Sequence, residues 1–234
     1  MSGEGLWAVV PAKDLAQAKR RLAGVLTAGE RQGLAQAMLE DVLTALAGVP
    51  ALAGTIVVTR EAALAATARS FGARVITDLR HEGPNAATML AARQLAAEGA
   101  AGMLAIPADV PLATAAEIGE IVAAVEAHPA VALVPALADM GTNAVALVPT
   151  DAIPIRFGPQ SFFQHLAAVL EHGMTPRILR LAGIGLDIDR PEDLAAFLAS
   201  GSGTRSHAYL EGCHVTARLP VVDVDPARRA IEPS

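Results

Sequence analysis

The sequence is short of cysteine and of aromatic residues: Cys213 is its one cysteine, and 3% of its 234 residues are aromatic. A single cysteine excludes an intramolecular disulfide and any metal site built from several thiolates. The chain is nevertheless 53% hydrophobic, so its core must be built mainly from Ala, Leu, Val and Ile. A chain of this length can bury a substantial core of that kind, and one domain is favoured over two.

Long apolar runs and an excess of basic charge are also lacking. No run of 18 apolar residues suggests a membrane span. The opening "MSGEGLWAVVPAK" has no basic region and too short an apolar stretch for a signal peptide. The net charge of -6 argues against broad nucleic-acid binding. We therefore expect a cytoplasmic protein without membrane or nucleic-acid partners.

What the sequence does contain is an alternation of short, continuously apolar runs with Ala/Leu-rich helical stretches. Such runs are typical of strands buried on both faces, and the alternation predicts a mostly parallel sheet with helices on both sides. We expect a single-domain, Rossmann-like α/β three-layer sandwich. The predicted strands are 6–10, 54–59, 73–77, 102–107 and 130–135, and the predicted helices are near 30–48, 61–71, 86–98 and 114–127.

Two of these helices begin with capping-box patterns, Thr27 to Glu30 and Thr114 to Glu117. In the first helix one apolar stripe recurs every four residues and is predicted to face the sheet. The stripe consists of Leu34, Met38, Val42 and Leu46.

The rhythm changes after residue 140, where the remaining elements are shorter. We expect a strand at 142–149, a helix at 161–172, short strands at 176–181 and 184–188, and a last helix from Pro191. Residues 1–199 are assigned to one domain. Residues 200–234, which begin with a linker-like piece, are assigned to a C-terminal tail with partial order.

Polar residues that follow the predicted strands are the candidates for chemistry, because ligands of open α/β sheets bind beyond the carboxyl ends of the strands. The segment after the first strand, "PAKDLAQAKRRL", is either a polyphosphate cradle or a solvated basic face. It has neither a Walker A motif nor a Rossmann glycine fingerprint. Its cations are Lys13, Lys19, Arg20 and Arg21.

Three further strand ends carry polar side chains. Asn85 either caps its helix or reads a nucleobase or ribose. Asp109 either ends a strand or holds a metal ion. Asp187 and Asp189 lie on a short extended piece, where strand alternation would let only one of them face inward. Carboxylates from separate strand ends suit Mg²⁺. His165 has no accompanying catalytic pattern.

Six motifs in a fixed order carry a family resemblance that spans residues 6 to 198. They are "PAKDLAQAKRRL" with the following helix, "GPNAA", "ADVP", "GTNA", "RFGPQSFFQH" and "LDIDRPEDL". With them the chain resembles the CofC/FbiD guanylyltransferases, which build the side chain of coenzyme F(420) and belong to the MobA-like nucleotidyltransferase superfamily. Pro84 and Arg20 depart from the residues common in that family.

The resemblance implies a reaction in which GMP passes from GTP to a phosphorylated three-carbon acid with release of pyrophosphate. The acceptor would be 2-phospho-L-lactate, phosphoenolpyruvate or 3-phospho-D-glycerate, and the cofactor Mg²⁺, as two ions. It assigns Lys13, Lys19 and Arg21 to catalysis. It assigns Lys13, Asn85 and Asp109 to the nucleotide, and Asp109 and Asp187 to the metal. It assigns Thr142, Gly158 and Ser161 to the acceptor.

Two alternatives stay open. Another MobA-like transferase, with a molybdopterin or sugar-phosphate acceptor, would usually open with a Gly-rich "LAGGxGxRM"-like loop, which this chain lacks. A non-catalytic nucleotide-binding domain would be expected to have lost a metal carboxylate, yet Asp109 and Asp187 are both present. The sequence leaves open whether the protein is a monomer or a homodimer, and whether Asp189 joins the metal site.

Overall fold

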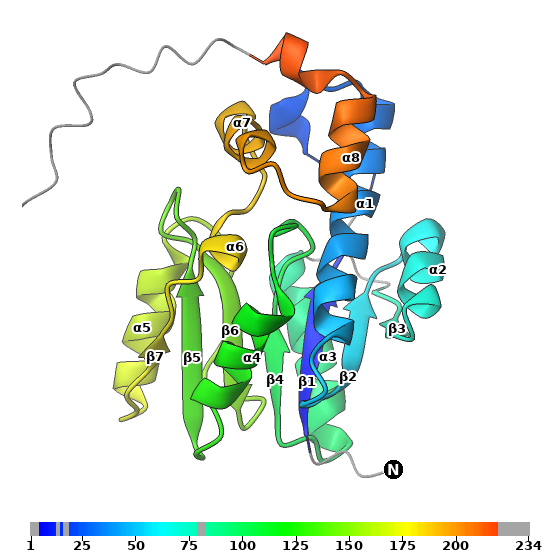
Figure 1. The fold of residues 1–234 in the computed structure, drawn as a ribbon. Helices are drawn as coiled ribbons and strands as arrows, with labels where there is room; N and C mark the ends of the chain where they lie inside the picture. The colour runs from blue at the N-terminus through cyan, green and yellow to red at the C-terminus, as the bar shows by residue number, and fades with distance from the viewer. Residues whose placement is uncertain (1–4, 13–14, 16–18, 79–82, 220–234) are drawn as a thin grey trace, which may run out of the picture.

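A seven-stranded sheet in the order β3-β2-β1-β4-β6-β5-β7 forms the centre of the protein (Figure 1). The computed structural model describes residues 5–12, 15, 19–78 and 83–219. Within this sheet β6 runs antiparallel to both of its neighbours, and the other pairs are parallel. The strands are β1 Leu6–Pro11, β2 Leu52–Val58, β3 Arg74–Ile76, β4 Gly102–Ala105, β5 Ala130–Pro135, β6 Thr142–Val148 and β7 Arg177–Ile178.

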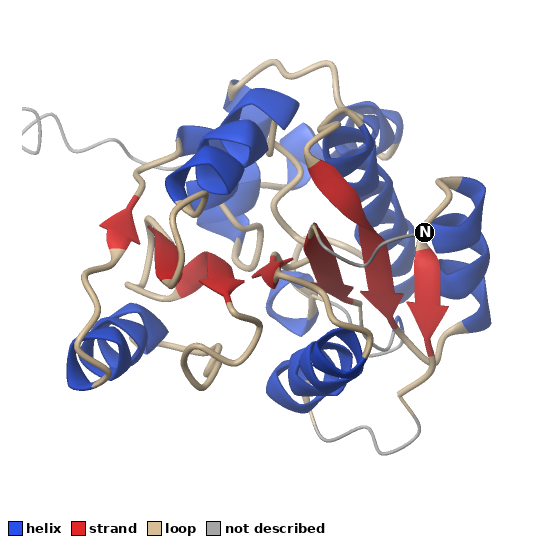
Figure 2. Cartoon of the chain, turned by 90° about the horizontal axis from the view of Figure 1, so that it is seen from below, coloured by secondary structure: helices blue, strands red, loops and turns tan. Residues whose placement is uncertain are grey.

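Helices cover both faces of the sheet, as the view along it shows (Figure 2). On one face Leu46, Leu64 and Ile118 bring α1, α2 and α4 against the strands. On the other face Leu95 and Val169 do the same for α3 and α5. The predicted α/β three-layer architecture is confirmed. These helices are α1 Ala28–Ala47, α2 Ala62–Ser70, α3 Pro84–Ala97, α4 Ala115–Ala124 and α5 Ser161–Glu171.

Both predicted capping boxes are present. The Thr27 hydroxyl accepts from the backbone N–H of Glu30 at 3.3 Å, and the Glu30 carboxylate accepts from the N–H of Thr27 at 2.7 Å. Thr114 and Glu117 do the same at the start of α4. Each box satisfies two donors that a helix N-terminus would otherwise leave unpaired, which fixes where α1 and α4 begin.

The apolar stripe of α1 is buried throughout, but the prediction that all of it faces the sheet was wrong. Val42 and Leu46 pack in the core above the sheet. Leu34 and Met38, one to two turns earlier, pack instead in a cluster with Phe197 of the C-terminal helices. The first half of α1 extends beyond the strand ends, so its partner there is a helix (Figure 1).

The segment after residue 190 forms a helical cap over that end of α1. It consists of α7 Pro191–Ala199, α8 Arg205–Gly212 and the 3-10 helix η3 Val215–Arg218, so the helix from Pro191 is not the last. Gly33 of α1 lies directly against the ring of Tyr209 in α8, where a β-carbon would have no room. A glycine in a helix interior costs stability, and here it permits this close approach.

The region between β7 and α7 also departs from the prediction. Residues 184–188 are not a strand, because Ala182–Gly185 form the short helix α6. Its backbone is tied to two neighbours: the N–H of Gly183 donates to Glu117 at 2.7 Å, and Gly185 accepts from the N–H of Leu137 at 2.9 Å. These contacts with distant segments decide the local conformation.

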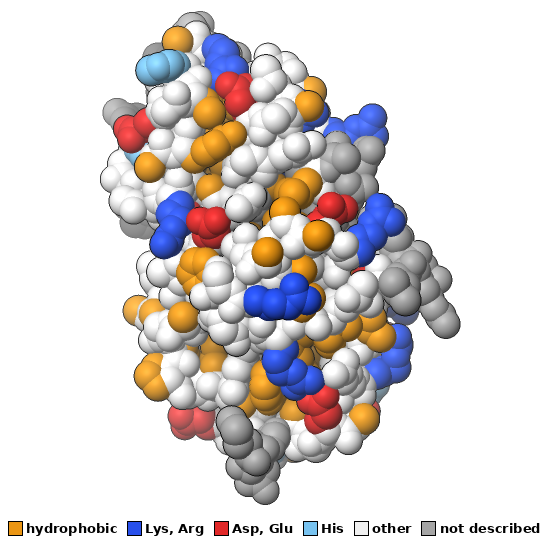
Figure 3. Space-filling model, turned by 90° about the vertical axis from the view of Figure 1, so that its right-hand side faces the viewer, with side chains coloured by type: hydrophobic (Ala, Val, Ile, Leu, Met, Phe, Trp, Pro, Cys, Tyr) orange, Lys and Arg blue, Asp and Glu red, His pale blue; other side chains and the backbone are white. Residues whose placement is uncertain are grey.

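No described helix is both long and apolar enough to cross a membrane. The face in Figure 3 carries arginine and lysine side chains scattered among acidic and hydrophobic ones, without a continuous basic surface.

Candidate functional site

A cavity of about 520 Å³ opens at the edge of the sheet where β1 and β4 end and β6 begins. Because β6 is antiparallel to β4, its first residue, Thr142, lies at the same edge as the carboxyl ends of the parallel strands. The segment after α6 also lines the cavity, through Asp187 and Asp189. Its polar lining includes Lys19, Asp109, Thr142, Gly158, Asp187 and Asp189.

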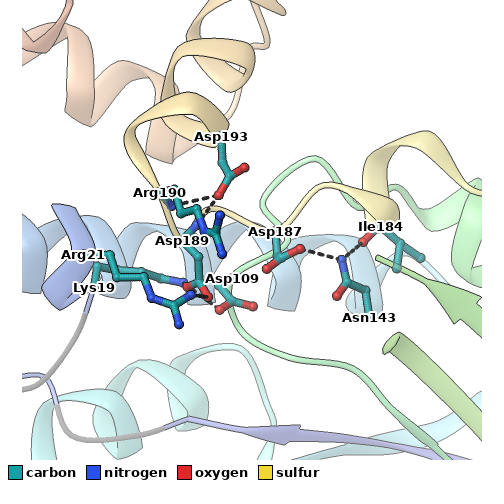
Figure 4. Close-up of polar contacts among 9 residues, drawn as sticks. All are labelled: Lys19, Arg21, Asp109, Asn143, Ile184, Asp187, Asp189, Arg190 and Asp193. Atoms are coloured by element: carbon teal, nitrogen blue, oxygen red, sulfur yellow. Dashed lines mark hydrogen bonds and ion pairs between the residues drawn. The ribbon is translucent and has the colours of Figure 1, made fainter. Parts of the chain in front are cut away.

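Lys19 joins two acidic segments across the mouth of this cavity (Figure 4). Its Nζ lies 2.6 Å from Oδ2 of Asp109 and 2.7 Å from Oδ1 of Asp189, and its side chain is 8% exposed. Burial alone would lower the pKa of Lys19, but the charges of the two carboxylates outweigh it and raise the pKa. The ammonium group is therefore held in its charged form inside the site.

Lys19 has an unusual backbone conformation. Lys19 has φ 50° and ψ 42°, the left-handed region, directly before the 3-10 helix η2 (Arg20–Leu22). A non-glycine residue in this region is usually strained, and it keeps this conformation only when tertiary contacts hold it. The two ion pairs of Lys19 are such contacts.

Asp187 is a carboxylate with a strongly raised pKa. Burial is the main cause, a hydrogen bond from Asn143 lowers the pKa, and the charges of Asp109 and Asp189 raise it, with a net pKa of about 6. The Asn143 amide donates to Oδ1 of Asp187 at 3.0 Å and to the carbonyl of Ile184 at 2.9 Å. Asp187 is thus a desolvated anion bound by an uncharged amide, an environment that favours a cation beside it.

Asp189 differs because cations compensate it. Burial would raise the pKa of Asp189, but Lys19, Arg21 and Arg190 lower it below its usual value. Arg21 is the weaker partner, at 3.8 Å and 61% exposed. Asp187 and Asp189 both line the cavity, so the expectation that only one of them faces inward was wrong. The segment is not a strand, and its backbone is tied to the β4 end by the N–H of Ile188 donating to the carbonyl of Asp109.

The predicted acceptor residues lie together at the same cavity. Thr142 and Gly158 line the cavity. Gly158 has φ 140°, a conformation that residues with a side chain rarely adopt. Ser161 is buried behind them, and its hydroxyl donates to Oγ1 of Thr142 at 3.1 Å.

Asn85 connects α3 to the loop that carries Gly158. Its amide oxygen accepts from the N–H of Phe157 at 2.7 Å, and its amide nitrogen donates to the Phe157 carbonyl at 3.2 Å. Both polar atoms of its side chain are thereby engaged with the loop that carries Gly158. Lys13, the remaining predicted residue, lies outside the described residues.

The carboxylates of the cavity could hold a divalent cation only if waters and substrate phosphates supply the other ligands. Among the described residues no group of three or more His, Cys, Asp or Glu side chains could hold a metal ion. Mg²⁺, however, commonly takes one or two carboxylates and completes its shell with waters and substrate phosphates. The desolvated Asp187 and the neighbouring Asp109 satisfy that smaller requirement.

Two residues with clear roles in this geometry were not singled out from the sequence. Asn143 lies in the "GTNA" motif and binds Asp187; a polar residue inside an otherwise apolar strand was the available signal. His165 ends the "RFGPQSFFQH" motif and contacts Thr142, but its position on a helix gave no sign of that contact.

Comparisons with known proteins show the family of this chain. The family described as "Guanylyl transferase CofC like" matches residues 6–223. A protein of Rubrobacter xylanophilus named phosphoenolpyruvate guanylyltransferase is 40% identical over 84% of this chain and 95% of its own. One of the same name from Sphaerobacter thermophilus is 38% identical over 80% and 89%.

Solved structures show the same fold at much lower identity. A Desulfovibrio desulfuricans protein named as a nucleotide-diphospho-sugar transferase superposes with a TM-score of 0.74 at 15% identity, covering 94% of this chain and 99% of its own. A nucleotidyl transferase from Methanothermobacter thermautotroptrophicus gives a TM-score of 0.57 at 16% identity, over 82% and 95%. The family match and the curated relatives span most of the chain, and on that basis the protein is a nucleotidyltransferase that belongs to the CofC-like guanylyltransferase family.

Proposed function

We propose that this protein transfers GMP from GTP to phosphoenolpyruvate and releases pyrophosphate, as a step of coenzyme F(420) biosynthesis. The observation that carries the proposal is one cavity that brings together a buried cation among carboxylates and buried hydroxyls beside a glycine at positive φ. The relatives named phosphoenolpyruvate guanylyltransferase favour that acceptor over the two other phospho-acids.

In the proposed reaction a phosphate oxygen of the acceptor attacks the α-phosphorus of GTP. The bond between that phosphorus and the bridging oxygen to the β-phosphate breaks, and pyrophosphate leaves with the electron pair. The attacking oxygen is already ionised at neutral pH, so the site needs no general base. Its task is alignment and neutralisation of the crowded negative charge.

The residues divide this task by position. Lys19 is the buried cation and Arg21 the exposed one, and both would contact phosphate oxygens. Thr142, Gly158 and Ser161 would bind the carboxylate or phosphate of the acceptor. Asp109 and Asp187 would hold Mg²⁺, which when bound supplies neutralisation of phosphate charge. Lys13 and Asn85 remain predictions for the nucleotide.

The test is pyrophosphate release by purified protein with Mg²⁺ and GTP, with phosphoenolpyruvate, 2-phospho-L-lactate and 3-phospho-D-glycerate supplied separately. We expect release with phosphoenolpyruvate, and a product whose mass equals GMP joined to the acceptor. Release with another acceptor alone would refute the acceptor. Release with CTP or ATP in place of GTP would refute the nucleotide.

We propose the cytoplasm as the compartment, because both substrates are metabolites of the cytoplasm. The oligomeric state can be measured on the same purified protein, where light scattering during size-exclusion chromatography would distinguish a monomer from a homodimer.

A further inference from the structure

His165 is a fully buried histidine that the proposed reaction does not use directly. It lies on α5, 0% exposed, and its ring has a polar contact at each nitrogen. Nε2 lies 3.0 Å from the backbone nitrogen of Arg156, and Nδ1 lies 2.9 Å from Oγ1 of Thr142. One ring thus touches both the loop that carries Gly158 and the hydroxyl that lines the cavity.

The backbone contact decides which ring nitrogen carries the proton. A backbone N–H can only donate, so Nε2 of His165 must accept and carries no proton. A neutral imidazole then has its proton on Nδ1, which donates to Thr142. Burial, together with the charge of Arg156, lowers the pKa of His165 to about 4, so the ring is neutral at neutral pH.

The hydroxyl of Thr142 can then make one further hydrogen bond, as a donor. Its oxygen accepts from Nδ1 of His165 and from the Ser161 hydroxyl at 3.1 Å, which occupies both lone pairs. The hydroxyl proton of Thr142 is the one proton of this three-residue network that no member of the network accepts. Thr142 lines the cavity whereas Ser161 is 1% exposed behind it, so the cavity is where an acceptor for that proton would lie.

We propose that His165 is a positioning residue for acceptor binding, whose ring turns the hydroxyl of Thr142 into a donor aimed at an anionic oxygen of the phosphorylated three-carbon acid. The identity of that acid rests on the proposed function. The direction of the hydrogen bonds among His165, Thr142 and Ser161 rests on the contacts alone. With the opposite tautomer, two donors would face each other at Nε2 and the hydroxyl would lose its fixed direction.

The first test reads the tautomer without any substrate. In a long-range ¹H–¹⁵N spectrum of the full chain, protonated and unprotonated imidazole nitrogens are well separated. The His165→Gln variant assigns the signals by the pair that disappears. We expect His165 to show a protonated Nδ1 and an unprotonated Nε2 at pH 7.5. A protonated Nε2 would overturn the proposal even if the enzyme is active.

The second test separates positioning from support of the fold. His165→Gln places an amide near the position of Nε2 but leaves the Nδ1 position empty, whereas His165→Asn does the reverse. We expect His165→Gln to raise the KM of the acceptor about 10- to 100-fold, the scale of a hydrogen bond to a charged group, with the KM of GTP changed less than about threefold. His165→Asn should lie closer to the wild type. The reverse order would mean that His165 acts through the Arg156 loop.

A double-mutant cycle then asks whether His165 acts through Thr142. In a Thr142→Val background His165→Gln should change the KM of the acceptor less than about threefold, because the hydroxyl that it orients is gone. Equal effects in both backgrounds would overturn the proposal. His172→Gln, at the exposed end of the same helix, is the matched control and should leave both KM values unchanged. If none of the three acceptors is used, the proposed function fails, and the spectrum still decides the orientation of the ring.

Discussion

Asp187 is a mostly buried carboxylate with a raised pKa and an uncharged hydrogen-bond partner, and its replacement is a sharp single-residue test of the site. In Asp187→Asn the amide oxygen can still accept from Asn143, so the local hydrogen bond is retained while the charge is lost. We expect kcat/KM to fall about 100- to 1,000-fold, as for loss of one electrostatic group at a reacting centre. Steady-state pyrophosphate release measures this.

The matched control for that charge change is Asp151→Asn, an exposed aspartate at the opposite end of β6. It should leave kcat/KM within about twofold, as expected for a surface change. Both variants should melt close to the wild type. An active Asp187→Asn protein with normal dependence on Mg²⁺ would remove this residue from the site.

A second prediction at the residue scale concerns His165 and the pH dependence of the free energy of unfolding. Its pKa is about 4 in the folded protein and near 6.5 when unfolded, so the unfolded chain binds the proton first as the pH falls. The stabilisation is complete above pH 6.5 and is lost between pH 6.5 and 4, by up to about 3 kcal/mol. Urea unfolding at several pH values should show this slope in the wild type and in His172→Asn. It should be reduced in His165→Asn.

At the scale of elements, one aspartate of α1 caps a helix more than 160 residues later in the chain. Asp41 is 7% exposed and accepts from the N–H groups of Arg205 and Ser206 at 2.8 and 2.9 Å. It also accepts from the Ser206 hydroxyl at 2.6 Å. Asp41→Ala leaves these donors buried without partners, and we expect a loss of roughly 2–4 kcal/mol in the free energy of unfolding.

Glu40→Ala is the control for this cap, because Glu40 reaches the same helix through a partly exposed ion pair with Arg205 at 3.4 Å. Such pairs contribute little, so its loss should cost less than about 1 kcal/mol. Urea unfolding compares the two variants, and hydrogen exchange over residues 205–212 shows whether α8 is the part released. Equal losses would mean that the cap contributes no more than the surface pair.

The elements also show what sequence patterns can and cannot predict. The helix starts at Ala28 and Ala115 were predictable because their caps are local, each made by residues three apart. The short helix at Ala182–Gly185 was not, because Glu117 and Leu137, both distant in the sequence, bind its backbone. Similarly, α8 has a local N-cap in Thr204, but no local pattern indicates that Asp41 accepts from the N–H groups of Arg205 and Ser206.

The site could be predicted at the level of strand ends but not of contacts. That Asp109 lies beyond the carboxyl end of β4 follows from the pattern, whereas Thr142 reaches the same edge because β6 is antiparallel, which the sequence did not predict. That Lys19 bridges Asp109 and Asp189, or that Asn143 binds Asp187, depends on backbone paths that no local pattern encodes, including the left-handed conformation of Lys19. Family resemblance supplied residue roles, and the three-dimensional arrangement supplied the partners of those residues.

At the scale of the whole molecule, the C-terminal helices pack against the part of α1 that lines the cavity. Met38 lines the cavity on one side and packs in the cluster with Leu210 and Val215 on the other. Both of these C-terminal side chains are fully buried. Removing them would expose the first half of α1, which carries Met38, and would leave the buried Asp41 carboxylate without its donors.

A chain of residues 1–199 should therefore be much less stable than a chain of residues 1–219, which keeps the contacts described for α8 and η3. Burial of two large aliphatic side chains and the cap together correspond to a difference in melting temperature of about 10 °C or more for a protein of this size. Thermal unfolding measures this, and GTP titration should show weaker binding by the shorter chain because its α1 is loosened beside the cavity. Equal melting temperatures and equal GTP affinity would mean that the domain ends at residue 199 and that α8 is an appendage to it. A stable 1–219 chain with a destabilised 1–199 chain would extend the folded unit through η3, with α1 as the element that joins the cap to the site.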